Sequence, residues 1–290
     1  MIVSVCTITY GHEKYIYETI ESVLNQKTSF EIEFIIANDN SPDNTDEIIL
    51  KYIKNHPKGN YIKYFKHPEN LGMIPNFNFA LQQCKGKYVA LCEGDDYWTD
   101  PLKLQKQVDF LESNSAYSGS AHQSTLLIDN AKSSFFKEPV PSDISVNDLI
   151  EGRLFHTASV IFRRSILDLY RQMPIVHSGD RLINFCMAIT GKIRFFDSSM
   201  CIYRLHSLGM SSNSSIQKML LDLNSIPYLK KLYPNFPSYR YKSYVYATVG
   251  LLKGVSMNKK VYYLFLSFFY SFSNFPGNMK IILNYFSKAK

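Results

Sequence analysis

The chain has 290 residues, of which 46% are hydrophobic and 20% are charged. This composition excludes a disordered protein, because so apolar a chain buries enough surface to offset the conformational entropy lost on folding. The formal net charge of +7 is unevenly spread, since Leu223 to the C-terminus holds ten basic residues and no acidic one. A mildly acidic body with a basic tail predicts two different tasks.

Four apolar segments in the first 112 residues read as buried strands, at 2–8, 30–37, 61–65 and 88–92. Amphipathic helices are expected between them, at 16–26, 41–55 and 76–84. Ser41 and Pro42 suit the cap and first turn of the second helix. Strand and helix in alternation predict an α/β fold with a doubly wound, mostly parallel sheet and helices on both faces.

The fourth strand runs directly into three carboxylates, Glu93, Asp95 and Asp96. Ligands of open α/β sheets bind at this carboxyl edge. Carboxylates this close repel one another, so we expect a divalent cation, Mg²⁺ or Mn²⁺, bridging them to a diphosphate. The alternative is that Asp95 and Asp96 only cap a turn.

Two other nucleotide-binding folds lack support in the sequence. A Rossmann dehydrogenase needs Gly-x-Gly-x-x-Gly after its first strand, and only Gly11 is present here. The glycine-rich loops of P-loop proteins and of sugar nucleotidylyltransferases are also missing. A diphosphate must therefore be held by a metal and by side chains.

The middle of the chain continues with a helix through Leu111, strands at 118–128 and a polar, proline-containing loop at 130–150. A strand is expected at 156–164, a helix at 182–189 and a short strand at 193–196. Asp180 stands just before that helix and suits its cap. His156 reads as a core or turn histidine.

Four short motifs follow the first four strands in order: Thr7 to Tyr10, Asn38-Asp39-x-Ser41-x-Asp43-x-Thr45, Asn70-Leu71-Gly72 with Asn76, and Glu93-Gly94-Asp95-Asp96-Tyr97-Trp98. Together they resemble the family-2 inverting glycosyltransferases of GT-A fold, of the bacterial surface-polysaccharide type. The resemblance covers about residues 1–110. One departure is Glu93, which stands where that family usually has an aspartate.

The resemblance implies roles for individual residues. Thr9 and Tyr10 would flank the base, Asp39 would accept a hydrogen bond from a uracil or thymine imide, and Glu93 would lie near the ribose. For Asp39 the alternative is an Asx turn. The implied nucleotide-sugar-binding set is Thr9, Tyr10, Glu13, Asp39, Asn70, Gly72, Asn76, Glu93, Gly94, Asp95 and Arg204.

The resemblance also extends beyond residue 110. It makes Asp180 the catalytic base, and it likens residues 203–211 to a flexible loop over the donor. Asp95, Asp96 and His206 are the implied metal ligands, with a contact beside the metal as the alternative for His206. The implied domains are a nucleotide-sugar-binding half at 1–112, an acceptor-binding half at 113–215 and a helical extension at 216–290.

The C-terminal extension mixes aromatic residues with lysines. Its most apolar run, Val261 to Phe275, is shorter than the ~20 residues needed to cross a bilayer. We therefore expect residues 223–290 to lie on an anionic membrane surface. The alternatives are a helical cap on the core or a dimer surface, while single-stranded nucleic-acid binding lacks a recognition fold.

These observations predict a metal-dependent glycosyltransferase of the hexosyltransferase type. The expected donor is a UDP- or dTDP-sugar, and the expected acceptor is a hydroxyl of a glycan or lipid-linked molecule in polysaccharide, lipopolysaccharide or capsule biosynthesis. The five scattered cysteines and the absence of a signal-like N-terminus predict a cytoplasmic protein, peripheral on the inner face of the membrane. The alternatives are a non-catalytic scaffold that binds sugar nucleotides and a sugar nucleotidylyltransferase.

Overall fold

The computed structural model describes residues 3–128, 131–135, 139–206, 215–252 and 254–271. The chain divides into two compact units. The sheet unit contains Met1–Ile144, Leu154–Arg171 and Thr190–His206, and the helical unit contains Ser145–Arg153, Gln172–Ile189 and Ser207–Lys290. The functional halves predicted with boundaries after 112 and 215 stay a prediction.

The sheet unit is built on a ten-stranded sheet of order β3-β2-β1-β4-β9-β6-β10-β5, with β7 beside β6 and β8 beside β10. The pairings β2–β3, β1–β2, β1–β4 and β6–β10 are parallel, and the others are antiparallel. The strands are β1 (Val3–Thr9), β2 (Ile32–Asn38), β3 (Ile62–Lys66), β4 (Tyr88–Leu91), β5 (Tyr97–Trp98), β6 (Tyr117–Ile128), β7 (Ala131–Ser134), β8 (Asp143–Ile144), β9 (Ile161–Arg163) and β10 (Lys192–Arg204).

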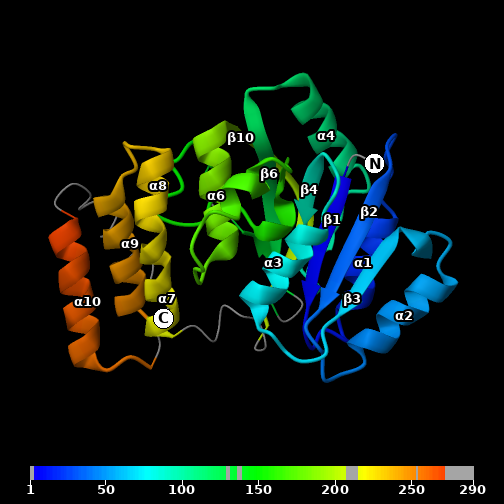
Figure 1. The fold of residues 1–290 in the computed structure, drawn as a ribbon, viewed down its shortest axis with the longest axis horizontal. Coiled ribbons are helices and arrows are strands. Elements are labelled where there is room, and N and C mark those ends of the chain that lie inside the picture. Colours follow the sequence, from blue (N-terminus) through cyan, green and yellow to red (C-terminus); the bar gives the residue numbers. More distant parts are fainter. Residues whose placement is uncertain (1–2, 129–130, 136–138, 207–214, 253, 272–290) are drawn as a thin grey trace. The chain divides into compact units, whose positions relative to one another are not determined.

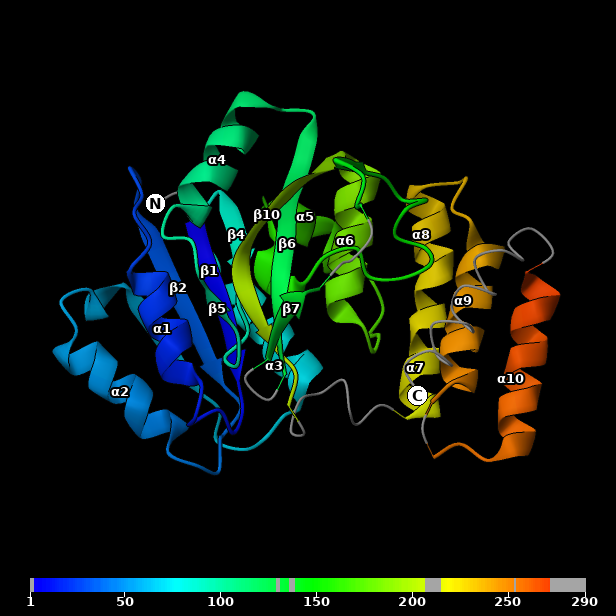
Figure 2. The same cartoon turned by 180° about the vertical axis from the view of Figure 1, so that it is seen from behind.

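Helices cover both faces of this sheet. Figure 1 shows α3 in front of the strands. Figure 2, which views the molecule from the opposite side, shows α1 and α2 in front of them. The helices of this unit are α1 (Ile16–Leu24), α2 (Thr45–Asn55), α3 (Met73–Gln83), α4 (Lys103–Ser113) and α5 (Ile166–Tyr170), with the 3₁₀ helices η1 (Gly59–Tyr61) and η2 (Thr157–Ser159). The predicted α/β class and doubly wound, mostly parallel sheet are confirmed, since most of the paired residues lie in the four parallel pairings.

The sequence explains why the first elements form. All seven residues of β2 are buried, as expected of a central parallel strand. Ile16, Ile20, Val23 and Leu24 of α1 are fully buried in the same hydrophobic cluster, so the predicted amphipathic helix packs its apolar stripe on the sheet. Each such side chain contributes about 1.5–3 kcal/mol through burial.

One charged side chain lies inside this core. Lys103 is fully buried. Its ammonium group donates to Gln107 Oε1 at 2.8 Å and lies 4.3 Å from the centre of the Trp98 ring. Burial lowers the pKa of Lys103 to about 8.

Three predicted boundaries are wrong. Helix α2 begins at Thr45, because the Ser41 hydroxyl donates to Asn38 Oδ1 and accepts from the Gly11 amide instead of capping the helix. The expected strand at 156–164 starts with η2, where the Ser159 hydroxyl donates to the carbonyl of His156. Strand β10 is much longer than the predicted 193–196, because it pairs along β6 on both sides of a register shift.

The helical unit carries the C-terminal extension. Its helices are α6 (Gly179–Thr190), α7 (Ile216–Leu220), η4 (Leu221–Ser225), α8 (Ile226–Leu232), α9 (Ser238–Gly250) and α10 (Met257–Tyr270). Phe185 of α6 meets the rings of Phe236 and Tyr241 edge to face at 5.4 and 5.3 Å. Helices α9 and α10 lie side by side (Figure 1), and the Ser243 hydroxyl donates to the carbonyl of Ser267. The helical character predicted for the extension is confirmed for its described residues.

All five cysteines are free and buried. Cys186 lies on α6 of the helical unit, and the other four lie in the sheet unit. Burial raises the pKa of Cys186 and of Cys201 to about 12. These thiols therefore stay protonated at neutral pH.

Candidate functional site

The carboxyl ends of β1, β2 and β4 meet at one edge of the sheet, because these neighbouring strands are parallel. The Gly94 amide donates to the carbonyl of Ile8 at 3.0 Å, and the Asp39 amide donates to the carbonyl of Thr9 at 3.0 Å. The loops after β2 and β4 are thus both attached to the end of β1. This edge brings together most of the predicted nucleotide-binding motifs.

Gly94 occupies a position where no side chain fits. A Cβ atom there would lie 2.7 Å from Thr9 Oγ1 and 2.8 Å from His12 Nδ1. These two side chains also contact each other, with Thr9 Oγ1 3.2 Å from His12 Nδ1. The glycine therefore allows the loop after β4 to approach the loop after β1.

Asp95 lies between two histidines. Its Oδ2 is 3.0 Å from His206 Nε2 and 3.8 Å from His12 Nε2. Burial alone would raise the pKa of Asp95, but the hydrogen bond with His206 and the attraction of His12 outweigh it and lower the pKa. Burial lowers the pKa of His12, although Asp95 opposes this shift. The cluster therefore offers a carboxylate beside an imidazole that favours its neutral form.

This donor set fits a divalent metal ion. Within the described part of the chain, no three His, Cys, Asp or Glu side chains are already arranged around an ion. His206 Nδ1 is buried and has no hydrogen-bond partner among the described residues. A carboxylate with imidazoles suits Mn²⁺ better than Mg²⁺, which prefers oxygen ligands, and phosphate oxygens or water would complete the coordination of a bound ion.

His12 is a site residue that the sequence analysis missed. Its ring reaches both Thr9 and Asp95. The available signal was its position three residues after the end of β1, at the edge where the carboxylates of the fourth strand were expected.

Asp96 has different surroundings from Asp95. It is 1% exposed, and its Oδ1 accepts a hydrogen bond from the Arg204 amide at 2.9 Å. Burial, followed by the charges of Asp95 and Glu93, raises its pKa well above the usual range. This enclosed carboxyl holds the end of β10, and its predicted role as a metal ligand stays a prediction.

Arg204 connects the Asp95 loop to α1. Its guanidinium donates to the carbonyl of Asp95 at 2.7 Å and forms an ion pair with the Glu18 carboxylate. The guanidinium also lies 4.6 Å from the centre of the Tyr97 ring. Arg204 was predicted to contact the donor, and in the structure these contacts hold the backbone of the Asp95 loop.

Asp39 links two loops at the same edge. It is buried, and its two carboxylate oxygens accept hydrogen bonds from the amides of Leu71 and Gly72 at 2.7 and 2.8 Å. The alternative of a local Asx turn is therefore wrong, because both bonds reach the loop after β3. Each oxygen keeps a second lone pair for an imide N–H.

The other predicted nucleotide-binding residues surround this edge. Asn76 is buried and donates to the carbonyl of Ala37, whereas Tyr10 is 48% exposed. Glu13 Oε2 accepts from the amide of Asn44. The remaining members are the exposed Asn70, the half-buried Glu93, and Gly72, whose φ of +91° favours glycine.

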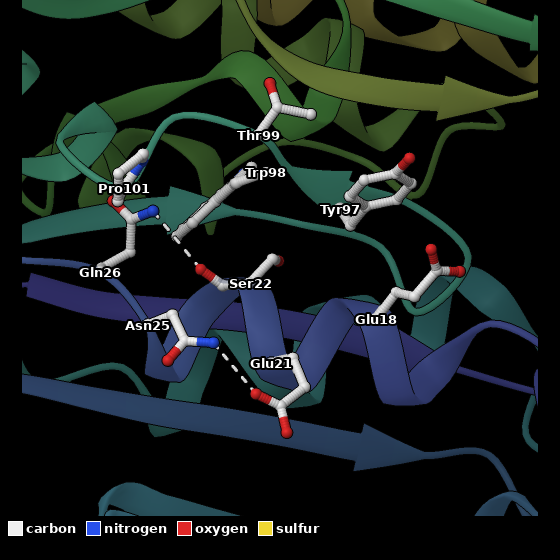
Figure 3. Close-up of a pocket in the computed structure, with 9 residues that line it drawn as sticks. All are labelled: Glu18, Glu21, Ser22, Asn25, Gln26, Tyr97, Trp98, Thr99 and Pro101. Atoms are coloured by element: carbon white, nitrogen blue, oxygen red, sulfur yellow. Dashed lines mark hydrogen bonds between the residues drawn. The ribbon is translucent and has the colours of Figure 1, made fainter.

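A surface pocket of about 310 Å³ lies elsewhere, between α1 and β5 (Figure 3). Its lining residues are Glu18, Glu21, Ser22, Asn25, Gln26, Tyr97, Trp98, Thr99 and Pro101. None of the predicted site residues is among them. Its amides already donate within the protein, Asn25 to Glu21 and Gln26 to the carbonyl of Asp100. The strand edge therefore remains the candidate site.

Asp180 belongs to the helical unit. It is the second residue of α6, so the interpretation as a helix cap is wrong, although a carboxylate in the first turn still favours the helix. Its Oδ2 accepts a hydrogen bond from the Arg153 guanidinium at 3.1 Å, and its side chain is 26% exposed. Residues 207–211 of the predicted loop over the donor lie outside the described residues.

Comparison with known proteins gives relatives from several microorganisms. An uncharacterised protein of Mycobacterium tuberculosis is 36% identical over 211 residues, which are 71% of this chain and 60% of the relative. The match thus spans less than two thirds of that relative's length. A putative teichuronic acid biosynthesis glycosyltransferase of Bacillus subtilis, TuaG, is 28% identical over 73% of this chain and 82% of its own.

Two solved structures share the fold. S. aureus TarS (residues 1–349), in complex with UDP-GlcNAc, matches with a TM-score of 0.61 at 20% identity and covers 94% of this chain and 73% of its own. The mannosyltransferase PcManGT from Pyrobaculum calidifontis, in complex with GDP-Man and Mn²⁺, matches with a TM-score of 0.55 at 15% identity, over 97% of this chain and 79% of its own.

The family model described as glycosyl transferase family 2 matches residues 4–169. This range includes β1 to β4, both loops attached to the end of β1, and the Asp95 cluster. With more than half of the sequence matched, the chain belongs to glycosyl transferase family 2.

Proposed function

We propose that the chain is an inverting, metal-dependent glycosyltransferase. It transfers a sugar from a UDP- or dTDP-sugar to a hydroxyl of a glycan or lipid-linked acceptor, in the biosynthesis of a cell-surface polysaccharide, lipopolysaccharide or capsule. The family supports the reaction class, and the name of the B. subtilis relative supports the polysaccharide context.

The observation that carries the proposal is the cluster of Asp95, His206 and His12 at the carboxyl edge of β4. These three side chains would hold the ion, with phosphate oxygens of the donor as further ligands. When bound, the metal stabilises the negative charge that develops on the departing nucleoside diphosphate. The Mn²⁺ complex of PcManGT supports this assignment.

The chain's own residues orient the donor and move one proton. Asp39 accepts from the base imide, while Arg204 and Gly94 keep the Asp95 loop in place. The acceptor oxygen attacks the anomeric carbon on the face opposite the diphosphate, whose oxygen leaves with the bonding electrons. Asp180 takes the proton from the attacking hydroxyl as the new bond forms.

The test is a transfer and hydrolysis assay with a panel of UDP-, dTDP- and GDP-sugars in the presence of Mn²⁺. We expect activity that EDTA removes and Mn²⁺ restores, and that Asp95→Asn abolishes while the fold is kept. Asp109→Asn is the matched control, because Asp109 is exposed and accepts a hydrogen bond from Gln105 on the same helix. Sugar-nucleotide binding without transfer or hydrolysis would instead support the non-catalytic scaffold.

We also propose that α10 attaches the protein to the inner face of the membrane. Six apolar side chains of this helix are at least half exposed: Met257, Val261, Tyr262, Phe265, Phe268 and Phe269. Lysines accompany them and no acidic residue follows Asp222, which suits anionic head groups. Helices of the described residues are too short or too polar to cross a bilayer.

Vesicle sedimentation tests this attachment. The full chain should sediment with vesicles containing phosphatidylglycerol and less with pure phosphatidylcholine, and salt should weaken the binding. Phe265→Ser combined with Phe269→Ser should release it, whereas Ile175→Ser, at an equally exposed apolar residue outside α10, should not. A dimer that dissociates on the same double substitution, with no vesicle binding, would overturn the proposal.

A further inference from the structure

The loop before α6 is held by a buried carboxylate from far along the chain. Asp222 of η4 is 7% exposed. Its Oδ1 accepts hydrogen bonds from the amides of His177 and Ser178, both at 2.9 Å, and its Oδ2 accepts from the Ser178 hydroxyl at 2.7 Å. Three bonds to two consecutive residues fix the backbone that enters α6, two residues before Asp180.

The backbone after Asp180 is anchored as well. The Arg181 guanidinium donates to the carbonyls of Leu149 and Ile150 at 3.0 and 2.7 Å. It also lies 4.2 Å from the centre of the Tyr244 ring on α9. Residues of the C-terminal extension thus contact the chain on both sides of the proposed base, at His177 and Ser178 before it and at Arg181 after it.

We propose that Asp222 is a positioning residue for Asp180, so that the C-terminal helices serve the transfer reaction in addition to any surface they bind. The inference rests on the proposed function, in which Asp180 is the base. Hydrogen bonds from amides to a carboxylate are among the strong ones, because the acceptor is charged. A base acts on one hydroxyl, and a displacement of about 1 Å costs up to ~100-fold in rate.

The test uses substitutions in the full chain, because truncation would remove the packing around α6. Asp222→Asn keeps the shape but removes the negative charge, so the amides of His177 and Ser178 lose their charged acceptor and the bonds weaken. We expect kcat to fall about tenfold with the KM for the donor unchanged. Ser178→Ala removes only the hydroxyl bond and should lower kcat less, in the same direction.

Glu151→Gln is the matched control. It weakens another ion pair of the helical unit, with Arg240, and should leave kcat unchanged. Circular dichroism verifies folding, and Ser178→Ala carries the test if Asp222→Asn does not fold. Unchanged kcat in the folded variants would overturn the inference.

A double substitution separates positioning from general loosening. In the Asp180→Asn background, Asp222→Asn should cause no further loss, because the group that it positions is already gone. A further tenfold drop would overturn the inference while leaving the base assignment intact. Full activity of Asp180→Asn alone would instead overturn the base assignment, and this inference with it.

Discussion

The sheet unit and the helical unit hold their candidate carboxylates in different ways. Asp95 follows β4 directly and is placed by loops at the ends of neighbouring parallel strands. Asp180 accepts a hydrogen bond from Arg153, and Asp222 bonds the two residues that precede α6. The position of Asp95 can be predicted from the end of its strand, whereas the start of α6 depends on bonds from residues distant in the sequence.

The largest expected effect removes the proposed base from the helical unit. Asp180→Asn should lower kcat by about 10²–10⁴-fold, because general base catalysis is lost. If the sheet unit alone holds the nucleotide, the affinity for the donor should stay unchanged. Isothermal titration calorimetry with UDP-sugar and Mn²⁺ measures this affinity. Loss of donor binding would show that the helical unit also helps to hold the nucleotide.

The next effect disturbs the sheet unit at its closest backbone approach. Gly94→Ala places a methyl group within 2.8 Å of Thr9 and His12, so the Asp95 loop must move. We expect a loss of about 1–3 kcal/mol in stability, together with weaker Mn²⁺ and donor binding. Denaturant unfolding and metal titration check this, and unaltered metal affinity would contradict the assigned role of the loop.

A pH-dependent effect concerns Lys103 in the core of the sheet unit. Its pKa is about 8 in the folded protein and 10.5 unfolded, so between these values the unfolded chain binds more protons. The free energy of unfolding should therefore rise as pH increases from 8 to 10.5, relative to Lys103→Met. Lys103→Met should add about 2 kcal/mol at pH 7 and abolish that rise. Identical pH profiles would contradict the buried charge.

The smallest effect loosens the contact between α1 and the Asp95 loop. Glu18→Gln removes the charge that pairs with Arg204, at a partly exposed site where such a pair contributes about 1 kcal/mol. Mn²⁺ affinity should fall a few-fold, with the maximal rate at saturating metal retained. A loss of the maximal rate would show that Arg204 also acts on the donor.

The first four strands could be predicted because each apolar run is long and ends in polar residues. The errors share one cause, which is that a local pattern ignores distant partners. Ser41 suits a cap by sequence, but Asn38 and Gly11 occupy its hydroxyl. The Glu18–Arg204 pair joins residues 186 positions apart.

Which segments make up the helical unit was even harder to predict from the sequence. Residues 172–189 belong to the same compact unit as the C-terminal helices, although they follow the sheet in the sequence. No periodicity in the sequence predicts that Asp222, the last acidic residue, bonds His177 and Ser178. The C-terminal extension was interpreted first as a membrane surface, with a helical cap on the core or a dimer surface as alternatives, and its Asp222 bonds the loop before α6.

The buried thiols give each unit its own reporter of local opening. Cys186 is shielded in the helical unit, and Cys6, Cys84, Cys92 and Cys201 are shielded in the sheet unit. Alkylation of a shielded thiol requires transient exposure, so its rate measures how often the surrounding structure opens. Mass spectrometry of alkylated peptides would therefore measure the rate of local opening in each unit separately, within one sample and without an engineered probe.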